Sequence, residues 1–248
     1  FQNPGGVTLS LERRYEVIAM ADHRGVPILE DDPYGDLRYE GERLPPLIAL
    51  DAQRMGPASM DACQGNVIYL GTFSKTLAPG LRLGWILASA EIIRYCVYAK
   101  QGMDLHTSTF AQMVAYEVAR GGFLEQHVRH ICQVYGERRD VMLRALEEFF
   151  PPGIRWTQPK GGLFLWVILP ETIDTGELLP EAVEKERVAF VPGSVFYPGQ
   201  GGHNTMRLNF SNARPEMIRE GIRRLGRVVA AKLENRVYSA AVAEKSPS

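Results

Sequence analysis

The spacing of apolar residues near the start of the chain predicts an amphipathic helix. Apolar side chains recur every three or four positions and so share one helical face. These positions are Leu11, Tyr15, Ile18 and Ala19. Ser10 can cap the first turn, and Gly25 can end the helix in a left-handed conformation. A short apolar run at residues 26–29 predicts a buried strand, and the turn-rich residues 30–35 form the loop at its carboxyl end.

The same alternation continues through the first half of the chain. Residues 67–71 and 83–88 are apolar runs and predict two more strands. Helices alternating with strands are typical of an α/β domain with a mainly parallel sheet, in which ligands bind at the carboxyl ends of the strands. Residues 91–150 then have an almost continuous helical pattern, broken at residues 102–108 and 121–122.

A different order of elements begins near residue 130. We expect four strands, at residues 154–157, 163–169, 188–191 and 205–210, and helices at residues 176–185 and 215–237. Strands and helices interleaved in this way predict a second, smaller α+β domain. The expected domains therefore span residues 1–130 and 131–248.

Composition narrows the class of protein. A net charge of −1 provides no broad electrostatic footprint for nucleic acid or an anionic membrane, so neither partner is expected. The apolar runs are too short to span a bilayer. The cysteines, Cys63, Cys96 and Cys132, form no paired motif and predict reduced thiols in a cytoplasmic protein. The histidines lack metal-ligand spacing, so no metal is expected. Arg138, Arg139 and Arg144 are expected on a solvated helix face.

A lysine lies in a loop of small residues between two apolar runs. Residues 71–85 read GTFSKTLAPGLRLGW, and Lys75 is their lysine. Lysine is rarely buried unless it is paired or functional, and an amine without its proton is a nucleophile. Thr72, Ser74 and Arg82 supply donors that can hold a phosphate. A lysine imine beside a phosphate site is the arrangement that pyridoxal 5′-phosphate (PLP) requires.

Three further residues can complete such a site. A carboxylate at a strand end, Asp31, can face a pyridine nitrogen and keep it protonated. The phenol of Tyr34 and the amide of Asn3 can hydrogen-bond the ring's phenolic oxygen. Each residue alone has an ordinary alternative, since DDPYG and NPGG are turn sequences, Lys75 can be a surface lysine, and Arg207 can be an exposed strand arginine. Their conjunction, at strand ends and in glycine-rich loops, favours the site.

With these motifs in view, the chain resembles the PLP-dependent aminotransferases of fold type I, class I/II. It is similar above all to the subgroup that contains 2-aminoadipate and multi-substrate aminotransferases. The matching motifs are FQNPGG (1–6), EDDPYGDLRY (30–39), GTFSKTLAPGLRLGW (71–85), PKGGLFLW (159–166), FVPGSVFY (190–197) and MRLNFS (206–211). They span nearly the whole chain. The resemblance implies an α/β fold in which residues 1–130 are the C-terminal part of the PLP-binding large domain.

The resemblance also implies a role for each matching residue. Lys75 would form the Schiff base with PLP and move the proton between the substrate Cα and the cofactor. Asp31 would pair with the ring nitrogen, and Asn3 and Tyr34 would hold the phenolic oxygen. The phosphate would be bound by Ser74 or Thr72 together with Arg82. Arg207, with Asn3, would bind the α-carboxylate of the amino acid or 2-oxo acid substrate.

Further expectations concern the completeness of the chain, its assembly and its alternative functions. FQNPGG lies at residue 1 with no methionine before it, so we expect a fragment that lacks part of the phosphate site and is inactive alone. The resemblance implies a homodimer. One alternative is the aminotransferase-like effector domain of a winged-helix transcription regulator, and another is a PLP lyase on the same fold.

Overall fold

The computed structural model describes residues 1–56 and 65–243, with side chains described as far as residue 234. The chain forms two compact units. One unit is Thr8–Ile131, and the other combines Phe1–Val7 with Cys132–Ser248. The first seven residues therefore group with the second unit, although the expected boundary assigns them to the first domain. The assignment of large and small domains itself stays a prediction.

The first helix, α1 (Leu11–Arg24), confirms the sequence expectation at both ends. The Ser10 side chain accepts a hydrogen bond from the backbone N–H of Arg13. Gly25 takes a left-handed conformation with φ of 62°, and its N–H donates to carbonyls of the last turn. Both caps satisfy backbone groups that the helix itself leaves unpaired.

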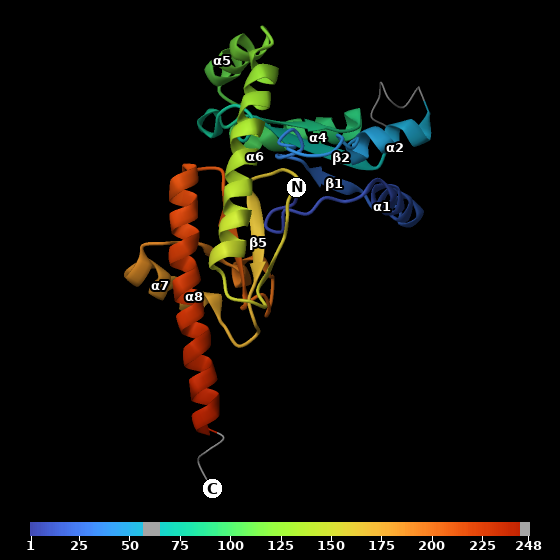
Figure 1. Ribbon diagram of the computed structural model, residues 1–248. Coiled ribbons are helices and arrows are strands. Elements are labelled where there is room, and N and C mark those ends of the chain that lie inside the picture. The colour runs from blue at the N-terminus through green and yellow to red at the C-terminus, as the bar shows by residue number, and fades with distance from the viewer. Residues whose placement is uncertain (57–64, 244–248) are drawn as a thin grey trace. The chain divides into compact units, whose positions relative to one another are not determined.

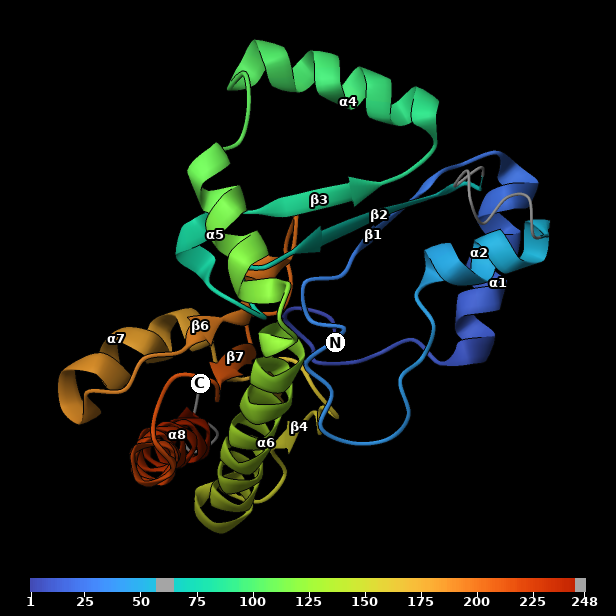
Figure 2. The ribbon, with the colours of Figure 1, turned by 90° about the horizontal axis from the view of Figure 1, so that it is seen from above.

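A three-stranded sheet lies at the centre of this unit, in the order β1 (Ile28–Asp31), β2 (Val67–Thr72), β3 (Gly84–Leu87). β1 and β2 are parallel, whereas β3 runs antiparallel to β2. Figure 2 shows the three strands side by side. β1 begins two residues later than its apolar pattern predicts, because pairing starts where Ile28 meets Val67.

The core of this unit lies between α1, the sheet and a helix that the sequence did not predict, α2 (Leu47–Met55) (Figure 1). Ile18, Leu50 and Val67 are each 2 % exposed and pack together there. Burying apolar surface of this kind is the main force that holds α1 and α2 to the sheet.

A carboxylate distant in sequence caps α2. Pro46 precedes the helix and offers no side-chain cap. Glu30 instead accepts hydrogen bonds from the backbone N–H groups of Leu47 and Ile48, at 2.7 and 3.0 Å. Burial raises the pKa of Glu30, and the two backbone hydrogen bonds offset only part of that effect.

Helices occupy most of residues 90–149, as expected. They are α4 (Ala90–Met103), α5 (Thr109–Ala119) and α6 (Phe123–Phe149). The breaks between them contain Ser108, which caps α5, and Gly122, whose φ is 77°. In the part of the chain that the structure describes, no helix is long and apolar enough to cross a membrane.

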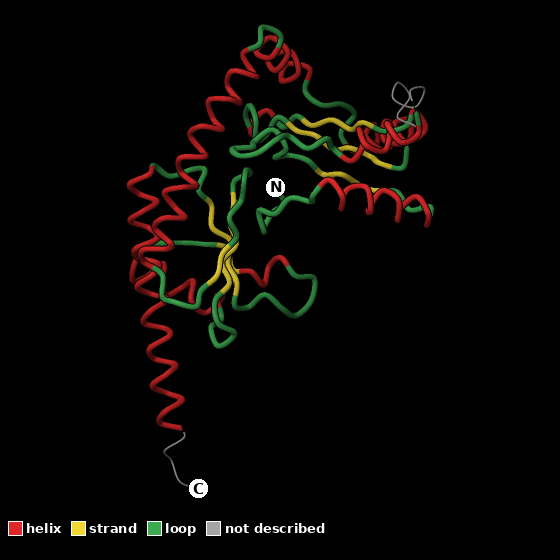
Figure 3. Tube along the Cα trace, turned by 45° about the vertical axis from the view of Figure 1, so that its right-hand side comes forward, coloured by secondary structure: helices red, strands yellow, loops and turns green. Residues whose placement is uncertain are grey.

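The second unit contains a four-stranded antiparallel sheet (strands in yellow in Figure 3). Its order is β4 (Arg155–Trp156), β5 (Phe164–Ile168), β7 (Thr205–Asn209), β6 (Val191–Pro192). One face carries Leu165, Val167, Met206 and Leu208, each at most 5 % exposed. Period-two alternation places Phe164, Trp166 and Arg207 on the other face. The remaining elements are α7 (Thr175–Glu186), the short 3-10 helix η2 (Gly193–Phe196) and α8 (Pro215–Ala243).

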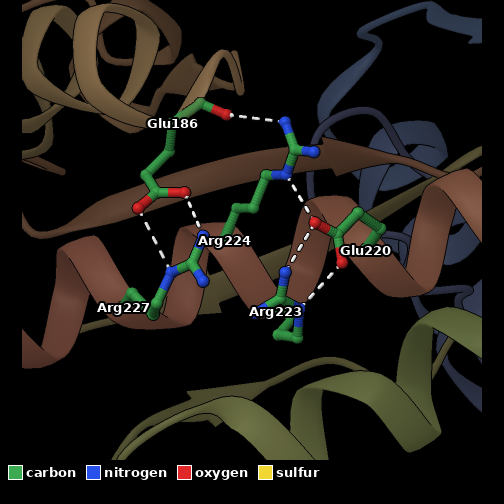
Figure 4. A network of polar contacts seen from close by, with 5 residues as sticks. All are labelled: Glu186, Glu220, Arg223, Arg224 and Arg227. Atoms are coloured by element: carbon green, nitrogen blue, oxygen red, sulfur yellow. Dashed lines mark hydrogen bonds and ion pairs between the residues drawn. The ribbon is translucent and has the colours of Figure 1, made fainter.

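A network of charged residues joins α7 to α8 (Figure 4). Glu186, at the end of α7, pairs with Arg227 through its carboxylate and accepts from Arg224 through its backbone carbonyl. Glu220 accepts hydrogen bonds from Arg223 and Arg224 at 2.7 Å. These hydrogen bonds lower the pKa of Glu220 to about 2. Within this network, only the contacts of Glu186 link α7 to α8, since Glu220, Arg223 and Arg224 all lie on α8. Partly exposed ion pairs of this kind contribute little to stability.

One arginine of α6 departs from the expected solvated face. Arg139 is 5 % exposed, and its Nη1 donates to the carbonyl of Pro159 at 2.9 Å. Its Nε and Nη2 donate to Asp140 Oδ1. A buried guanidinium needs hydrogen-bond partners in place of water. The sequence alone did not predict the burial of Arg139, because its partner is a backbone carbonyl 20 positions away.

Candidate functional site

The loop after β2 carries the predicted lysine, and hydrogen bonds close it tightly. The backbone N–H of Phe73 donates to the carbonyl of Leu83 at 3.2 Å. Thr72 Oγ1 donates to the same carbonyl at 2.8 Å and accepts from the N–H of Ser74 at 3.1 Å. The hydroxyls of Thr72 and Ser74 lie 2.9 Å apart. Lys75 follows directly and is half-buried, so a compact turn presents it just beyond the strand.

Arg82 lies at the other end of this loop. It takes a left-handed backbone conformation with φ of 54° after the 3-10 turn η1 (Pro79–Leu81). This conformation is strained for a residue other than glycine, and backbone strain of this kind is concentrated at functional sites. The side chain is exposed, and its Nη1 donates to the carbonyl of Pro79 at 3.1 Å. Together with Ser74 it gives the loop one hydroxyl and one guanidinium for an anion.

Gly71 places β3 against this loop. It pairs with Trp85, whose ring fills the space above the glycine: an added Cβ would lie 2.2 Å from a Trp85 ring atom. The Trp85 ring also packs on Phe73, with ring centroids 4.8 Å apart. Only glycine leaves room for this approach.

We therefore predict that Gly71→Ala destabilises the protein by about 1–3 kcal/mol, since Trp85 must move. Denaturant unfolding monitored by circular dichroism measures this change. Gly80→Ala is the matched control, because nothing lies within 4 Å of a Cβ added at Gly80. Equal stability of the two variants would contradict the predicted role of Gly71.

Asp31 ends the strand next to the lysine loop. β1 and β2 are parallel, so Asp31 and Thr72 end their strands at the same edge of the sheet. The pairing extends one residue further, since the N–H of Asp32 donates to the carbonyl of Leu70 at 3.0 Å. Asp31 is exposed there, and Tyr34, in the following turn, is 9 % exposed. The predicted carboxylate and lysine therefore share the edge at which parallel sheets bind ligands.

A tyrosine that the sequence did not single out lies beside this carboxylate turn. The Tyr69 hydroxyl donates to Asp32 Oδ2 at 3.4 Å. Partial burial, followed by the negative charges of Asp32, Asp36 and Glu30, raises the pKa of Tyr69 to about 12. The phenol therefore stays protonated at neutral pH and remains a donor. No local pattern marks Tyr69, because it occupies an ordinary position in an apolar strand.

A cavity of about 360 Å³ lies against the lysine loop within the same unit. Phe73, Leu83 and Trp85 line one side, and Gln112 and Tyr116 of α5 line the other. Its volume and largely apolar lining are typical of small-molecule pockets. Sequence reasoning missed it because α5 and the loop meet only in the folded chain.

The second unit brings together the other two predicted residues. Arg207 Nη1 donates to Asn3 Oδ1 at 2.7 Å, across 204 positions of sequence. The Arg207 guanidinium carbon also lies 4.2 Å from the centroid of the Phe164 ring and 5.0 Å from that of Phe196. A guanidinium held against aromatic rings suits planar recognition of a carboxylate.

The segment that carries Asn3 packs tightly within this unit. The N–H of Gly6 donates to the carbonyl of Gln2 at 2.7 Å, and Gly6 has φ of 70°. A Cβ on Gly6 would lie 2.8 Å from the carbonyl oxygen of Phe164 and 3.0 Å from Pro159. Pro159 is in turn the partner of buried Arg139. Arg139 therefore supports the segment that places Asn3 against Arg207.

The structure thus describes the predicted residues in two groups. Asp31, Thr72, Ser74 and Lys75 gather at one sheet edge of Thr8–Ile131. Asn3 and Arg207 pair in the other unit. The assigned roles of all these residues remain predictions.

Comparison with known proteins identifies one family and several similar proteins. The sequence profile of the family described as "Aminotransferase class I and II" matches residues 1–225. The chain is 47 % identical over 234 residues to aromatic-amino-acid aminotransferase 1 of Thermococcus litoralis, covering 94 % of this chain and 53 % of that protein.

Two solved structures share both the fold and the sequence. The multiple substrate aminotransferase of Thermococcus profundus is 45 % identical with a TM-score of 0.86, over 94 % of this chain and 55 % of that one. The α-aminoadipate aminotransferase LysN of Thermus thermophilus, complexed with N-(5′-phosphopyridoxyl)-L-leucine, is 40 % identical with a TM-score of 0.87, over 94 % and 57 %.

The regulator alternative is less well supported. An HTH-type transcriptional regulator of Bacillus subtilis is 33 % identical over 223 residues, covering 43 % of that protein. Its identity lies well below that of the enzymes, so the comparison favours the enzymes. The chain spans about half the length of the curated relatives that it matches.

Proposed function

This chain belongs to the class I and II aminotransferase family, and we propose on that basis that the protein is a PLP-dependent aminotransferase. It would transfer an amino group between an L-amino acid and a 2-oxo acid. The observation that carries the proposal is the lysine loop, in which Lys75 and two hydroxyls follow a parallel strand, at the edge where the neighbouring strand ends in Asp31.

The donors present suit PLP, which is a planar pyridine with a phenolic oxygen, an aldehyde and a phosphate. The residues offer an amine for the aldehyde, a carboxylate for the ring nitrogen, and a hydroxyl with a guanidinium for the phosphate. When bound, PLP supplies an electron sink that lets the substrate Cα give up and regain a proton.

Lys75 has two roles in this proposal. Its amine holds the cofactor covalently through the aldehyde carbon. Its amine, when not bound to the cofactor, would take the proton from the substrate Cα as a general base and return it as a general acid. A tightly closed loop supports this role, because proton transfer depends on the position of the amine.

The other proposed cofactor contacts involve the ring nitrogen, the phenolic oxygen and the phosphate. Asp31 holds the proton on the ring nitrogen, and Tyr34 and Asn3 donate to the phenolic oxygen. Ser74 and Arg82 bind the phosphate. The Thr72 hydroxyl already donates to the Leu83 carbonyl, which supports Ser74 as the phosphate hydroxyl and Thr72 as the residue that shapes the loop.

Arg207 binds the substrate α-carboxylate through its planar fork. Its hydrogen bond to Asn3 Oδ1 supports this assignment in a second way. Because Oδ1 accepts from Arg207, the Asn3 side-chain nitrogen is the atom that remains to donate to a ligand. Asn3 would therefore orient Arg207 through its oxygen and keep its nitrogen as a donor.

The compartment and assembly are also proposals. Cys96, which forms no disulfide within the described residues, supports a reducing, cytoplasmic location; Cys63 lies outside the described residues. Large apolar side chains on α4 and α5 support a homodimer, since exposed apolar patches mark interfaces. Met103 is 85 % exposed and Phe110 is 80 % exposed.

A panel of L-amino acids and 2-oxo acids tests the proposed function. We expect the full-length protein, with PLP, to convert at least one amino acid into its 2-oxo acid while the acceptor gains the amino group. Chromatography of both products measures the exchange. Release of an amine with loss of carbon dioxide would instead identify a PLP lyase and contradict the proposal.

A further inference from the structure

We propose that Phe196 is a positioning residue for Arg207, holding the guanidinium plane so that its fork meets the substrate carboxylate. The inference rests on the proposed function and concerns how that site is built. Phe196 would act through Arg207 without touching the reacting atoms.

The sheet brings the aromatic rings to Arg207 in a fixed arrangement. Arg207 pairs directly with Trp166 across β5 and β7, and Phe164 lies on the same face two residues away. On the other side of β7, Arg207 pairs with Val191 of β6. β6 is followed directly by η2. Phe196, the last residue of η2, lies against the Arg207 guanidinium.

The start of η2 packs too tightly to shift. Gly193 is buried, and an added Cβ would lie 1.8 Å from Thr205 Oγ1 and 2.7 Å from the carbonyl oxygen of Gly202. Thr205 Oγ1 donates to that same carbonyl at 2.6 Å. The short helix is therefore fixed against β7, which fixes the distance of Phe196 from Arg207.

A second ring supports Phe196. The Trp166 and Phe196 rings meet edge-on, with centroids 5.6 Å apart and an interplanar angle of 75°. Trp166 is 8 % exposed and anchored in β5. An edge-on aromatic contact of this kind stabilises the orientation of both rings.

Electrostatics favours this environment for a guanidinium. An aromatic ring carries negative charge density on its face, which attracts a cation within about 6 Å of the centroid. Phe164 and Phe196 both satisfy this distance, at 4.2 and 5.0 Å. With Asn3 Oδ1 accepting from Nη1, three contacts restrict rotation of the fork. Pre-orienting a side chain lowers the entropy that substrate binding must offset.

The test compares three variants of the full-length protein loaded with PLP. Phe196→Leu keeps apolar bulk and removes the ring, Phe196→Tyr keeps the ring, and Arg207→Gln removes the guanidinium. Calorimetry measures the binding of 3-phenylpropanoate and of its neutral amide, 3-phenylpropanamide. Thermal unfolding of each variant checks that the protein is folded.

We expect Phe196→Leu to weaken binding of the carboxylate about 3- to 10-fold and to leave binding of the amide unchanged. Phe196→Tyr should bind both probes as the wild type does. In turnover, Phe196→Leu should raise KM for the amino acid and leave kcat unchanged, because the ring does not touch the reacting atoms.

Two results would overturn the inference. One is wild-type carboxylate binding by Phe196→Leu, and the other is an equal loss in Phe196→Leu and Phe196→Tyr. If Arg207→Gln loses carboxylate binding in either case, the proposed role of Arg207 survives and only the role of Phe196 fails. If Arg207→Gln binds the carboxylate as the wild type does, the proposed carboxylate site fails as well.

Discussion

Replacing Lys75 with alanine is expected to lower kcat/KM for transamination by about 1,000-fold or more, because the variant loses both the covalent hold on the cofactor and the group that moves the Cα proton. The loop itself should survive, since its closing hydrogen bonds come from Thr72 and from the backbone of Phe73 and Leu83. Steady-state kinetics with the best donor and acceptor from the amino-acid panel measures the change.

Lys100→Ala is the matched control. Lys100 lies on α4 in the same unit, with its side chain 44 % exposed, and pairs with Asp104 at 3.0 Å. Its loss should leave kcat/KM within about twofold of the wild type, because an exposed ion pair of this kind contributes little. Comparable activity of Lys75→Ala and Lys100→Ala would show that Lys75 has no part in the reaction.

Replacing Arg207 with glutamine is expected to lower kcat/KM by about 10- to 100-fold, which corresponds to the loss of charge-assisted hydrogen bonds to the substrate carboxylate. Arg207→Lys should recover only part of this loss, since an ammonium keeps the charge but lacks the planar fork. The effect should appear mainly in KM, because the carboxylate is bound in the ground state as well as in the transition state.

Arg219→Gln controls for the loss of one positive charge. Arg219 is exposed on α8, where its charge pairs with Glu148 of α6. Its substitution should leave KM unchanged. An Arg207→Gln variant with wild-type KM for every amino acid in the panel would rule out the proposed carboxylate contact.

The sequence predicted an element correctly where the apolar pattern and the capping residues lie within or next to that element. The apolar period of α1, its Ser10 cap and Gly25 are all contained in residues 10–25, so sequence and structure agree there. α2 went unpredicted because Glu30, 17 positions upstream of Leu47, supplies its cap. Such a cap exists only after β1 and α2 have come together.

Two strands were predicted with the wrong limits for a similar reason. The strand expected at residues 188–191 is reduced to Val191–Pro192. Val188 instead donates to Ala182 and completes the end of α7, where Arg187 takes a left-handed conformation. Likewise, β1 starts where β2 offers a partner and not where the apolar run begins. Pairing across the sheet decides strand limits, and a single segment does not contain that information.

In the candidate site, too, contacts between residues close in sequence were predictable and contacts between distant residues were not. The lysine loop was predictable because Thr72, Ser74, Lys75 and Arg82 lie within eleven positions of one another. The contact between Asn3 and Arg207 joins residues 204 positions apart, and the rings beside Arg207 come from β5 and η2. Motifs indicated which residues to examine, and the fold supplied their partners.

The most direct test of the central claim is the position of the covalent link to the cofactor. The full-length protein is incubated with PLP, reduced with borohydride, digested and mapped by peptide mass spectrometry. The proposed function predicts a single pyridoxyl-modified residue, Lys75, and no modification at that peptide in Lys75→Ala. An active protein whose modification lies on any other lysine, with Lys75 unmodified, would contradict it.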